Sequence, residues 1–185
     1  MAANNRVRIS GGDWRSRLLN FPDVPGLRPT PDRVRQTVFN WLGQDMHGRR
    51  CLDLFAGTGA MGFEALSRGA STVVLVEKAA VATRSLQQNQ AQLKASQARV
   101  LQQDAQQFLA QNRERFDVIF LDPPYEQGWL PKLLPLLSGH LAEGGMLYVE
   151  AEYQLEDDAQ WQVVKHGKAG NVCYHLLKLA TESID

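Results

Sequence analysis

The stretch Cys51-Leu52-Asp53-Leu54-Phe55-Ala56-Gly57-Thr58-Gly59 decides the fold of this 185-residue chain. Its first five residues form an apolar run that is typical of a buried strand, and residues 60–67 have the pattern of a helix. Gly57 and Gly59 allow the backbone between them to turn sharply and to approach a ligand closely. The stretch therefore predicts a strand, a ligand-binding glycine loop and a helix. The glycine spacing alone does not identify the ligand, because nicotinamide enzymes share it.

Strands and helices alternate along the rest of the chain. Further strands are expected at residues 72–76, 99–101, 116–121 and 146–150, and helices at residues 79–94, 105–112 and 129–137. Pro131 and Pro135 are expected to bend the last helix, and residues 143–145 to form a turn. The final strands, 161–166 and 172–179, predict an antiparallel hairpin. This order predicts an α/β fold with a mostly parallel seven-stranded sheet and helices on both faces.

The N-terminal part precedes this alternation. Residues 6–19 alternate weakly around two glycines and predict a small β-hairpin arm. A proline-rich loop follows, and a helix is expected from Pro31 to Leu42 with Thr30 as its N-cap. We therefore divide the chain into a basic N-terminal arm of residues 1–30 and one α/β domain of residues 31–185.

The charge of the chain is unevenly distributed. Residues 1–50 contain nine arginines, no lysine and four aspartates, whereas the whole chain has a formal net charge of zero. The N-terminal segment is therefore basic and the remainder is acidic. A basic segment of this kind favours a polyanionic partner.

The composition also excludes several classes of protein. Cys51 and Cys173 lie in apolar segments and predict reduced thiols, and the four histidines lack metal-ligand spacing. No apolar run approaches the length of a membrane span, and the N-terminus lacks the apolar region of a signal peptide. We therefore expect a cytoplasmic, metal-free protein, and by default a monomer.

Acidic residues at the ends of successive strands predict the cofactor. Glu77 ends the second strand, where a carboxylate accepts hydrogen bonds from both ribose hydroxyls. Asp53 puts a negative charge beside the glycine loop, which disfavours a pyrophosphate and favours a cationic ligand. S-adenosylmethionine fits, because it has an ammonium and a sulfonium group and no phosphate. Asp104 follows the third strand, where it is placed to bond the adenine amino group or to cap the helix that begins at Ala105.

The sequence Asp122-Pro123-Pro124-Tyr125 follows the apolar strand 116–121. The prolines end the strand, so a carboxylate, a rigid turn and an aromatic ring lie at the carboxyl edge of the sheet, where α/β proteins bind ligands. Asp122 and the Pro123 carbonyl can each accept a hydrogen bond from one N–H group of an exocyclic amine, and the Tyr125 ring can stack on the base. The alternative is a proline-stiffened loop without a catalytic role.

Together these motifs resemble the class I S-adenosylmethionine-dependent methyltransferases, which have a Rossmann-like fold. The proline motif is similar to the (Asp/Asn/Ser)-Pro-Pro-(Tyr/Phe/Trp) of the members that methylate amino groups. Residues 8–17 and 27–42 are similar to the N-terminal signature of the bacterial RsmD family, and the resemblance extends from about Arg6 to Leu179. That family methylates the exocyclic amine of one guanine in 16S ribosomal RNA. The resemblance implies that substrate. Because the chain shows no separate recognition domain, we expect the base to be presented on an assembled or assembling small subunit.

The motifs, the basic arm and the resemblance together predict three sets of site residues. The base would be held by Asp122, Pro123, Pro124 and Tyr125. The cofactor set is Asp53, Phe55, Gly57, Thr58, Gly59, Glu77, Asp104 and Ala105. The set that contacts RNA is Arg6, Arg8, Trp14, Arg15, Arg17, Arg28, Thr30, Arg33 and Lys168. Most of this third set is basic, as phosphate contacts require.

Four other functions remain open. An adenine amino-methyltransferase acting on DNA or RNA would use the same motif, although the DNA enzymes usually have a recognition insert for which this chain has no room. Glutamine-methylating enzymes have Asn in place of Asp122. A non-catalytic RNA-binding assembly factor could retain the fold, and a nicotinamide oxidoreductase would share the glycine loop.

Overall fold

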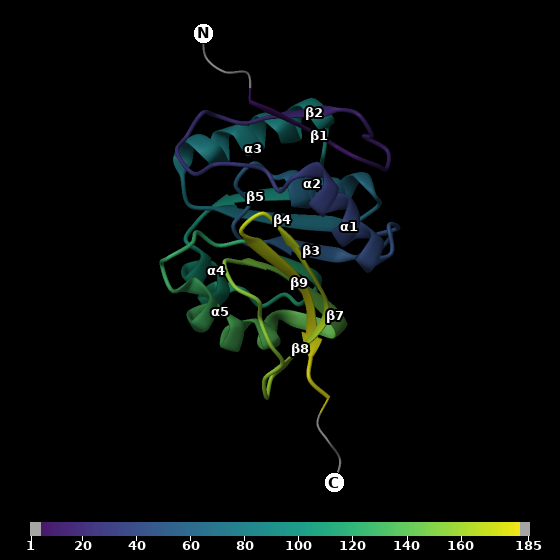
Figure 1. Cartoon of the computed structure of the whole chain (residues 1–185). Coiled ribbons are helices and arrows are strands. Elements are labelled where there is room, and N and C mark those ends of the chain that lie inside the picture. Colours follow the sequence, from purple (N-terminus) through teal and green to yellow (C-terminus); the bar gives the residue numbers. More distant parts are fainter. Residues whose placement is uncertain (1–4, 182–185) are drawn as a thin grey trace.

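The computed structural model describes residues 5–181 and shows one central β-sheet between two layers of helices (Figure 1). The sheet has seven strands in the order β5-β4-β3-β6-β7-β9-β8. Their bounds are β3 (Arg50–Asp53), β4 (Thr72–Glu77), β5 (Ala98–Gln102), β6 (Phe116–Leu121), β7 (Leu141–Ala151), β8 (Trp161–Ala169) and β9 (Val172–Leu179). The first five pair in parallel, and β9 is antiparallel to both β7 and β8. The predicted sheet and terminal hairpin are confirmed.

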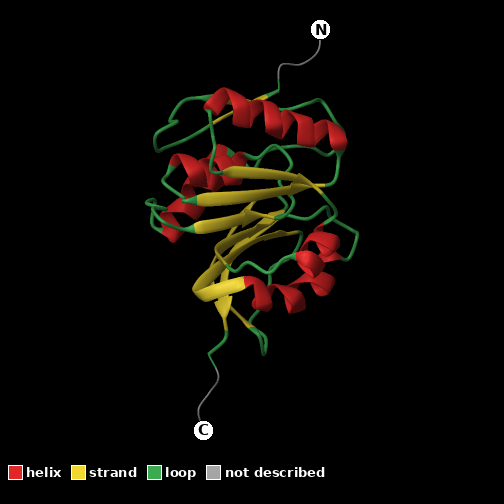
Figure 2. Cartoon of the chain, turned by 180° about the vertical axis from the view of Figure 1, so that it is seen from behind, coloured by secondary structure: helices red, strands yellow, loops and turns green. Residues whose placement is uncertain are grey.

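The central strands are apolar on both faces because helices cover both. Successive side chains of a strand point to opposite faces, so Cys51 and Val118 lie in one core and Leu52 and Ile119 in the other. The first core lies under α1 (Asp32–Leu42), α2 (Ala60–Ser67) and α3 (Ala80–Leu93). The second lies under α4 (Ala105–Gln111) and α5 (Trp129–Leu137), on the opposite side of the sheet (Figure 2). A short 3₁₀ turn, η1 (Ser138–His140), follows α5.

The predicted N-terminal hairpin is confirmed as β1 (Arg6–Arg8) paired antiparallel with β2 (Leu18–Asn20). Its apolar side chains Val7, Ile9 and Leu19 are buried in the core that α1, α2 and α3 cover. The hairpin is therefore packed onto the α/β body. The division at residue 30 stays a prediction, and residues 1–4 and 182–185, which it includes, lie outside the described residues.

A buried carboxylate fixes the hairpin to the body. Glu64 of α2 is fully buried and accepts hydrogen bonds from the backbone N–H groups of Ser10, at 2.8 Å, and Gly11, at 3.1 Å. Arg68 donates to the same carboxylate at 3.1 Å, and the buried Arg35 of α1 lies 3.7 Å from it. Because a buried charge needs partners, this cluster holds α1, α2 and the hairpin in one arrangement.

Three local predictions were wrong. Thr30 does not cap α1: Pro31 occupies the cap position without a side-chain hydrogen bond, and the Thr30 hydroxyl bonds elsewhere. Residues 143–145 do not form a turn before the strand at 146–150; β7 runs through them and bulges against β6, where Gly144 adopts a positive φ of 72°. Lys168, expected in the turn between the strands 161–166 and 172–179, lies within β8, since the tight turn comes after it, at Gly170.

Helix α5 confirms the helix expected at residues 129–137, but Pro131 and the internal Pro135 do not interrupt it. Both cysteines are free, and burial raises the pKa of the Cys51 thiol to about 12, so it stays protonated. Among residues 5–181, no helix has the length and apolar character needed to cross a membrane.

Candidate active site

A cavity of about 590 Å³ opens at the carboxyl edge of the sheet, between the two central strands. The chain leaves β3 toward β4 and β5 but leaves β6 toward β7, so the strand order reverses between β3 and β6. Open α/β sheets bind ligands at such a reversal point. Asp53 is the last residue of β3 and Asp122 is the first after β6, and both line the cavity.

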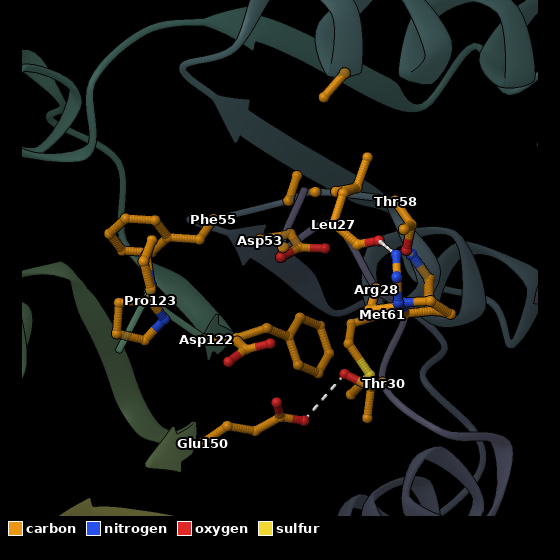
Figure 3. A pocket seen from close by; sticks show the side chains of 18 of the residues that line it. Leu27, Arg28, Thr30, Asp53, Phe55, Thr58, Met61, Asp122, Pro123 and Glu150 are labelled. Atoms are coloured by element: carbon orange, nitrogen blue, oxygen red, sulfur yellow. Dashed lines mark hydrogen bonds between the residues drawn. The ribbon is translucent and has the colours of Figure 1, made fainter. Parts of the chain in front are cut away.

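Chain segments from distant parts of the sequence build the walls. The glycine loop after β3 forms one wall and the proline-rich loop 24–31 another. Ala169 and Val172, which flank the turn of the terminal hairpin, complete the lining. Figure 3 shows the side chains of Thr30, Asp122 and Glu150 together in this space.

The lining is acidic. It contains the carboxylates of Asp53, Glu77, Asp122 and Glu150, whereas Arg28 is the one basic residue among its described members. Such a cavity disfavours a pyrophosphate and favours a ligand with positive charge, as the sequence predicted for the region around Asp53.

Burial controls the charge of these carboxyl groups. It raises the pKa of Asp53 to about 8, against the opposing hydrogen bond of 3.0 Å from the Gly62 backbone N–H. It also raises the pKa of Glu77, although the backbone N–H groups of Gly57, Ala79 and Lys78 partly oppose this. A bound cation would favour the charged forms of both groups.

The two glycines of the loop have different tasks. Gly57 has a φ of +54° and lines the cavity, so the backbone there is open to a ligand. Gly59 has a φ of +80°, and a Cβ there would lie 2.6 Å from Leu86 and 2.7 Å from Phe63. Gly59 therefore permits close packing beneath the loop and lies behind the cavity wall.

The structure brings together most of the predicted cofactor residues. Asp53, Phe55, Gly57, Thr58 and Glu77 line the cavity. The other three do not: Gly59 packs inward as described, and Asp104 caps α4, accepting hydrogen bonds from two backbone N–H groups at 2.9 and 3.3 Å. Ala105 is buried behind it. In this structure Asp104 has the capping role that the sequence left open.

All four residues of the proline motif line the same cavity. Burial raises the pKa of Asp122 well above its usual range, and the charge and hydrogen bond of Glu150 raise it further. Tyr125 is 38% exposed at the rim, so its ring is accessible for stacking. The motif therefore faces the same space as Asp53 and Glu77.

Sequence reasoning missed Glu150 and Tyr148, which lie on the same side of β7. Glu150 is buried, and its Oε1 accepts hydrogen bonds from the Thr30 hydroxyl at 3.0 Å and from the Tyr148 hydroxyl at 2.6 Å. No motif spacing marks them. The available signal was position: Glu150 lies near the carboxyl end of the strand beside β6, the same edge that placed Asp122.

The basic residues predicted to contact RNA are all exposed: Arg6, Arg8, Arg15, Arg17, Arg28, Arg33 and Lys168. Arg28 also lines the cavity. Trp14 is half-buried and packs against the core, and Thr30 is buried. Arg35, two residues from Arg33, faces the interior, so only one of these helix arginines is accessible.

The comparisons with known proteins identify the family. A family model described as "Conserved hypothetical protein 95" matches residues 7–178. "Ribosomal RNA small subunit methyltransferase D" of Escherichia coli K12 is 43% identical over 180 residues, which cover 95% of this chain and 91% of that protein. The protein of the same name from Haemophilus influenzae is 41% identical, covering 94% of both. The chain belongs to the RsmD family.

Solved structures agree with this membership. The "putative methyltransferase yhhF" of Escherichia coli has a TM-score of 0.86 and 42% identity, covering 96% of this chain and 100% of that one. A more distant neighbour is the Thermus thermophilus 16S rRNA N2 G1207 methyltransferase RsmC, solved in complex with AdoMet and guanosine. It has a TM-score of 0.69 at 23% identity over 94% of this chain and 49% of that one, which shows the fold alone.

This RsmD-family member is thus an S-adenosylmethionine-dependent methyltransferase, and the prediction of a Rossmann-like class I fold is confirmed. The cavity fits the cofactor, since its acidic lining matches two positive charges and its apolar lining suits an adenosine group. Asp53, Gly57 and Glu77 are the residues we expect to hold it. Within residues 5–181, no group of His, Cys, Asp and Glu side chains is arranged to hold a metal.

Proposed function

We propose that this RsmD-family member methylates the exocyclic amine, N2, of a guanine in small-subunit ribosomal RNA, on an assembled or assembling subunit. The names of its relatives from Escherichia coli and Haemophilus influenzae support the RNA substrate. The observation that supports the amine is geometric: Asp122 and Tyr125 line the same cavity as Asp53 and Glu77. An amine held by the proline motif would therefore meet the methyl donor without passing through another site.

The proline motif addresses the difficulty of this reaction. The lone pair of a guanine amine is delocalised into the ring, which makes the nitrogen a poor nucleophile. Asp122 and the Pro123 carbonyl can each accept one of its N–H groups, and this favours a pyramidal nitrogen with its lone pair directed at the methyl group. Because Pro123 and Pro124 stiffen the turn, both acceptors are held in place before the base arrives. When bound, S-adenosylmethionine supplies an electrophilic methyl group on a sulfonium.

The exposed residues supply RNA binding in this proposal. The seven exposed basic residues of the predicted set would contact phosphate oxygens. Tyr125 would stack on the target base, a contact worth about 1–3 kcal/mol. The base must leave its helix or already be unstacked to enter the cavity. We place the protein in the cytoplasm, where its ribosomal substrate is assembled.

Identification of the product tests the proposal. The protein is incubated with radiolabelled S-adenosylmethionine and, separately, with naked 16S ribosomal RNA, with small subunits that lack the modification and with duplex DNA. The products are digested to nucleosides and separated. We expect N2-methylguanosine, formed faster on subunits than on naked RNA. N6-methyladenosine as the product would contradict the guanine assignment, and faster transfer to naked RNA would contradict the particle as substrate.

A further inference from the structure

Glu150 stands next to the residue that is expected to hold the amine. It is the penultimate residue of β7, which pairs with β6, the strand that ends before Asp122. The Glu150 side chain is buried, with 6% of the residue exposed. One of its oxygens bonds Thr30, and the carboxyl groups of Glu150 and Asp122 face each other in the cavity (Figure 3).

The hydrogen bonds around this pair place one proton on Asp122. Glu150 Oε1 accepts two O–H groups, from Thr30 and Tyr148, as a carboxylate does. No other described N–H or O–H group of the chain donates to the Asp122 carboxyl, so the hydrogen bond between the two acids needs a proton from one of them. Glu150 already accepts two O–H groups and Asp122 accepts none from the described residues, so we assign the proton to Asp122, which donates it to Glu150. Burial, which raises the pKa of Asp122, agrees with this assignment.

The other groups that face the pair form no hydrogen bond with Asp122 in the described part of the chain. Asp53 faces it from β3, and its carboxyl group accepts the Gly62 backbone N–H at 3.0 Å. Tyr148 of β7 and Tyr125 of the proline motif also face it, and burial raises the pKa of both phenols. Glu150 is therefore the group in direct hydrogen-bond contact with Asp122 to which a proton of Asp122 can pass.

We propose that Glu150 is the final acceptor of the proton that the amine loses on methylation, and that Asp122 relays this proton to it. The inference rests on the proposed function to the extent that an exocyclic amine is the methyl acceptor.

Atoms and charge balance in this step. The nitrogen lone pair forms the N–C bond while the C–S bond breaks, and the electron pair of that bond stays on sulfur. The nitrogen becomes positively charged and gives one proton to the free oxygen of Asp122. The proton that Asp122 already holds moves to Glu150. Asp122 ends the step with one proton, as it began, and the loss of the negative charge on Glu150 matches the loss of the positive charge on sulfur.

A purely structural role for Glu150 makes a different prediction. If Glu150 served only to hold Thr30 and Tyr148, an amide would serve nearly as well, because Gln retains the size and an acceptor oxygen. A Gln side chain cannot take up a proton from Asp122. Glu150→Gln therefore separates proton acceptance from the positioning of the loop.

The experiment measures single-turnover methyl transfer to subunits that lack the modification, with the complex formed beforehand. For Glu150→Gln we expect a rate at least about 100-fold lower, the usual contribution of a general base, with cofactor affinity within about threefold of wild type. The matched control is Glu152→Gln, an exposed carboxylate two residues away that accepts the Glu126 backbone N–H outside the cavity. Its rate should stay within about twofold of wild type.

A second variant tests the same role by chemical rescue. Glu150→Ala leaves a space beside Asp122, and sodium formate should restore part of the rate in proportion to its concentration, whereas sodium chloride at equal ionic strength should not. A Glu150→Gln rate within about threefold of wild type would overturn the inference. So would a slow Glu150→Ala variant that formate does not rescue.

Failure of this inference is distinguishable from failure of the proposed function. The nucleoside made by the wild-type enzyme tests the function, and the ratio of variant to wild-type rates tests the relay. N6-methyladenosine as the product would contradict the guanine assignment and leave the relay intact, because an adenine amine also loses a proton.

Discussion

Thr30 and Glu150 lie 120 residues apart in the chain, and a hydrogen bond of 3.0 Å joins the Thr30 hydroxyl to Glu150 Oε1. Both residues are buried. The bond connects the proline-rich loop, which forms one wall of the cavity, to the end of β7. Loop and sheet are thus held together at the point where the cofactor and the base are expected to meet.

Thr30→Val should weaken both folding and cofactor binding. The variant keeps the shape of the side chain but removes the donor, at a cost of about 1–3 kcal/mol for a buried acceptor left with one bond fewer. We expect a lower urea midpoint and a several-fold weaker affinity for S-adenosylmethionine in calorimetry. Thr30→Ser keeps the hydroxyl and serves as the control. Equal effects of both variants would show that the methyl group, and not the hydrogen bond, is what matters.

Glu64→Gln should destabilise the whole protein. Glu64 is fully buried among two backbone N–H donors and the guanidinium groups of Arg35 and Arg68. Removing one member of a buried ionic cluster leaves its partners uncompensated, and typical costs are about 3–5 kcal/mol. Urea unfolding followed by circular dichroism measures the loss.

An exposed ion pair provides the comparison for this variant. Arg99 and Glu114 lie 3.4 Å apart with about half of each side chain exposed. Glu114→Gln should therefore change stability by less than about 1 kcal/mol. A similarly small effect of Glu64→Gln would mean that packing of Val7, Ile9 and Leu19, and not the charge cluster, holds the hairpin.

These residues also show what the sequence could reveal. The succession of strands and helices along the chain, the glycine loop and the edge position of Asp122 follow from local patterns, and each was confirmed. Local patterns could not predict the hydrogen-bond partner of Thr30. Its local sequence matches a helix cap, whereas the group that its hydroxyl bonds is 120 residues away. Arg35 and Arg33 look alike in sequence, and only the packing of α1 decides that Arg35 is interior. Long-range polar contacts were the part that local patterns could not supply.

Asp53 should make cofactor binding depend on pH. Its pKa in the free protein is raised to about 8, so at pH 7 the cavity mostly contains the neutral acid. A cationic ligand prefers the carboxylate, and binding should release a proton. Affinity should therefore rise with pH by up to about tenfold per unit below pH 8 and level off above it. Titration calorimetry at several pH values, in buffers of different ionisation enthalpy, measures both effects.

Asp53→Asn is the control, because it keeps an acceptor for the Gly62 backbone N–H. The ratio of wild-type to variant affinity isolates Asp53 from ionisation of the ligand itself. The pH dependence of folding stability gives a second check, because stability should fall with rising pH whereas cofactor affinity should rise. The folded state holds the Asp53 proton more tightly than the unfolded state, so wild-type stability relative to the variant should fall from about pH 4 to pH 8. A ratio of wild-type to variant affinity that does not change with pH would contradict the raised pKa of Asp53.

Asp122→Ala should abolish methyl transfer while leaving cofactor affinity within about fivefold of wild type. Asp122 belongs to the part of the cavity formed by β6 and the proline motif, whereas the expected cofactor residues Gly57 and Glu77 come from the loop after β3 and from the end of β4. Transfer is measured on unmodified subunits and affinity by calorimetry. A parallel loss of both would show that Asp122 is needed for the shape of the site and not for the reaction alone.

The exposed arginines of the hairpin should set the salt dependence of RNA binding. Arg6 and Arg15 are exposed and form no side-chain hydrogen bond or ion pair with other residues in the described part of the chain, so Arg6→Gln and Arg15→Gln should not disturb the fold. Removing one arginine that binds a phosphate should reduce the slope of log affinity against log salt by about 1. Arg113→Gln, which changes an exposed arginine between α4 and β6, is the control for loss of charge as such. A smaller salt slope in the hairpin variants alone would support the hairpin as the RNA-binding surface. The same salt slope in all three variants would mean that the arginines act by long-range electrostatic attraction, without direct binding of the hairpin to RNA.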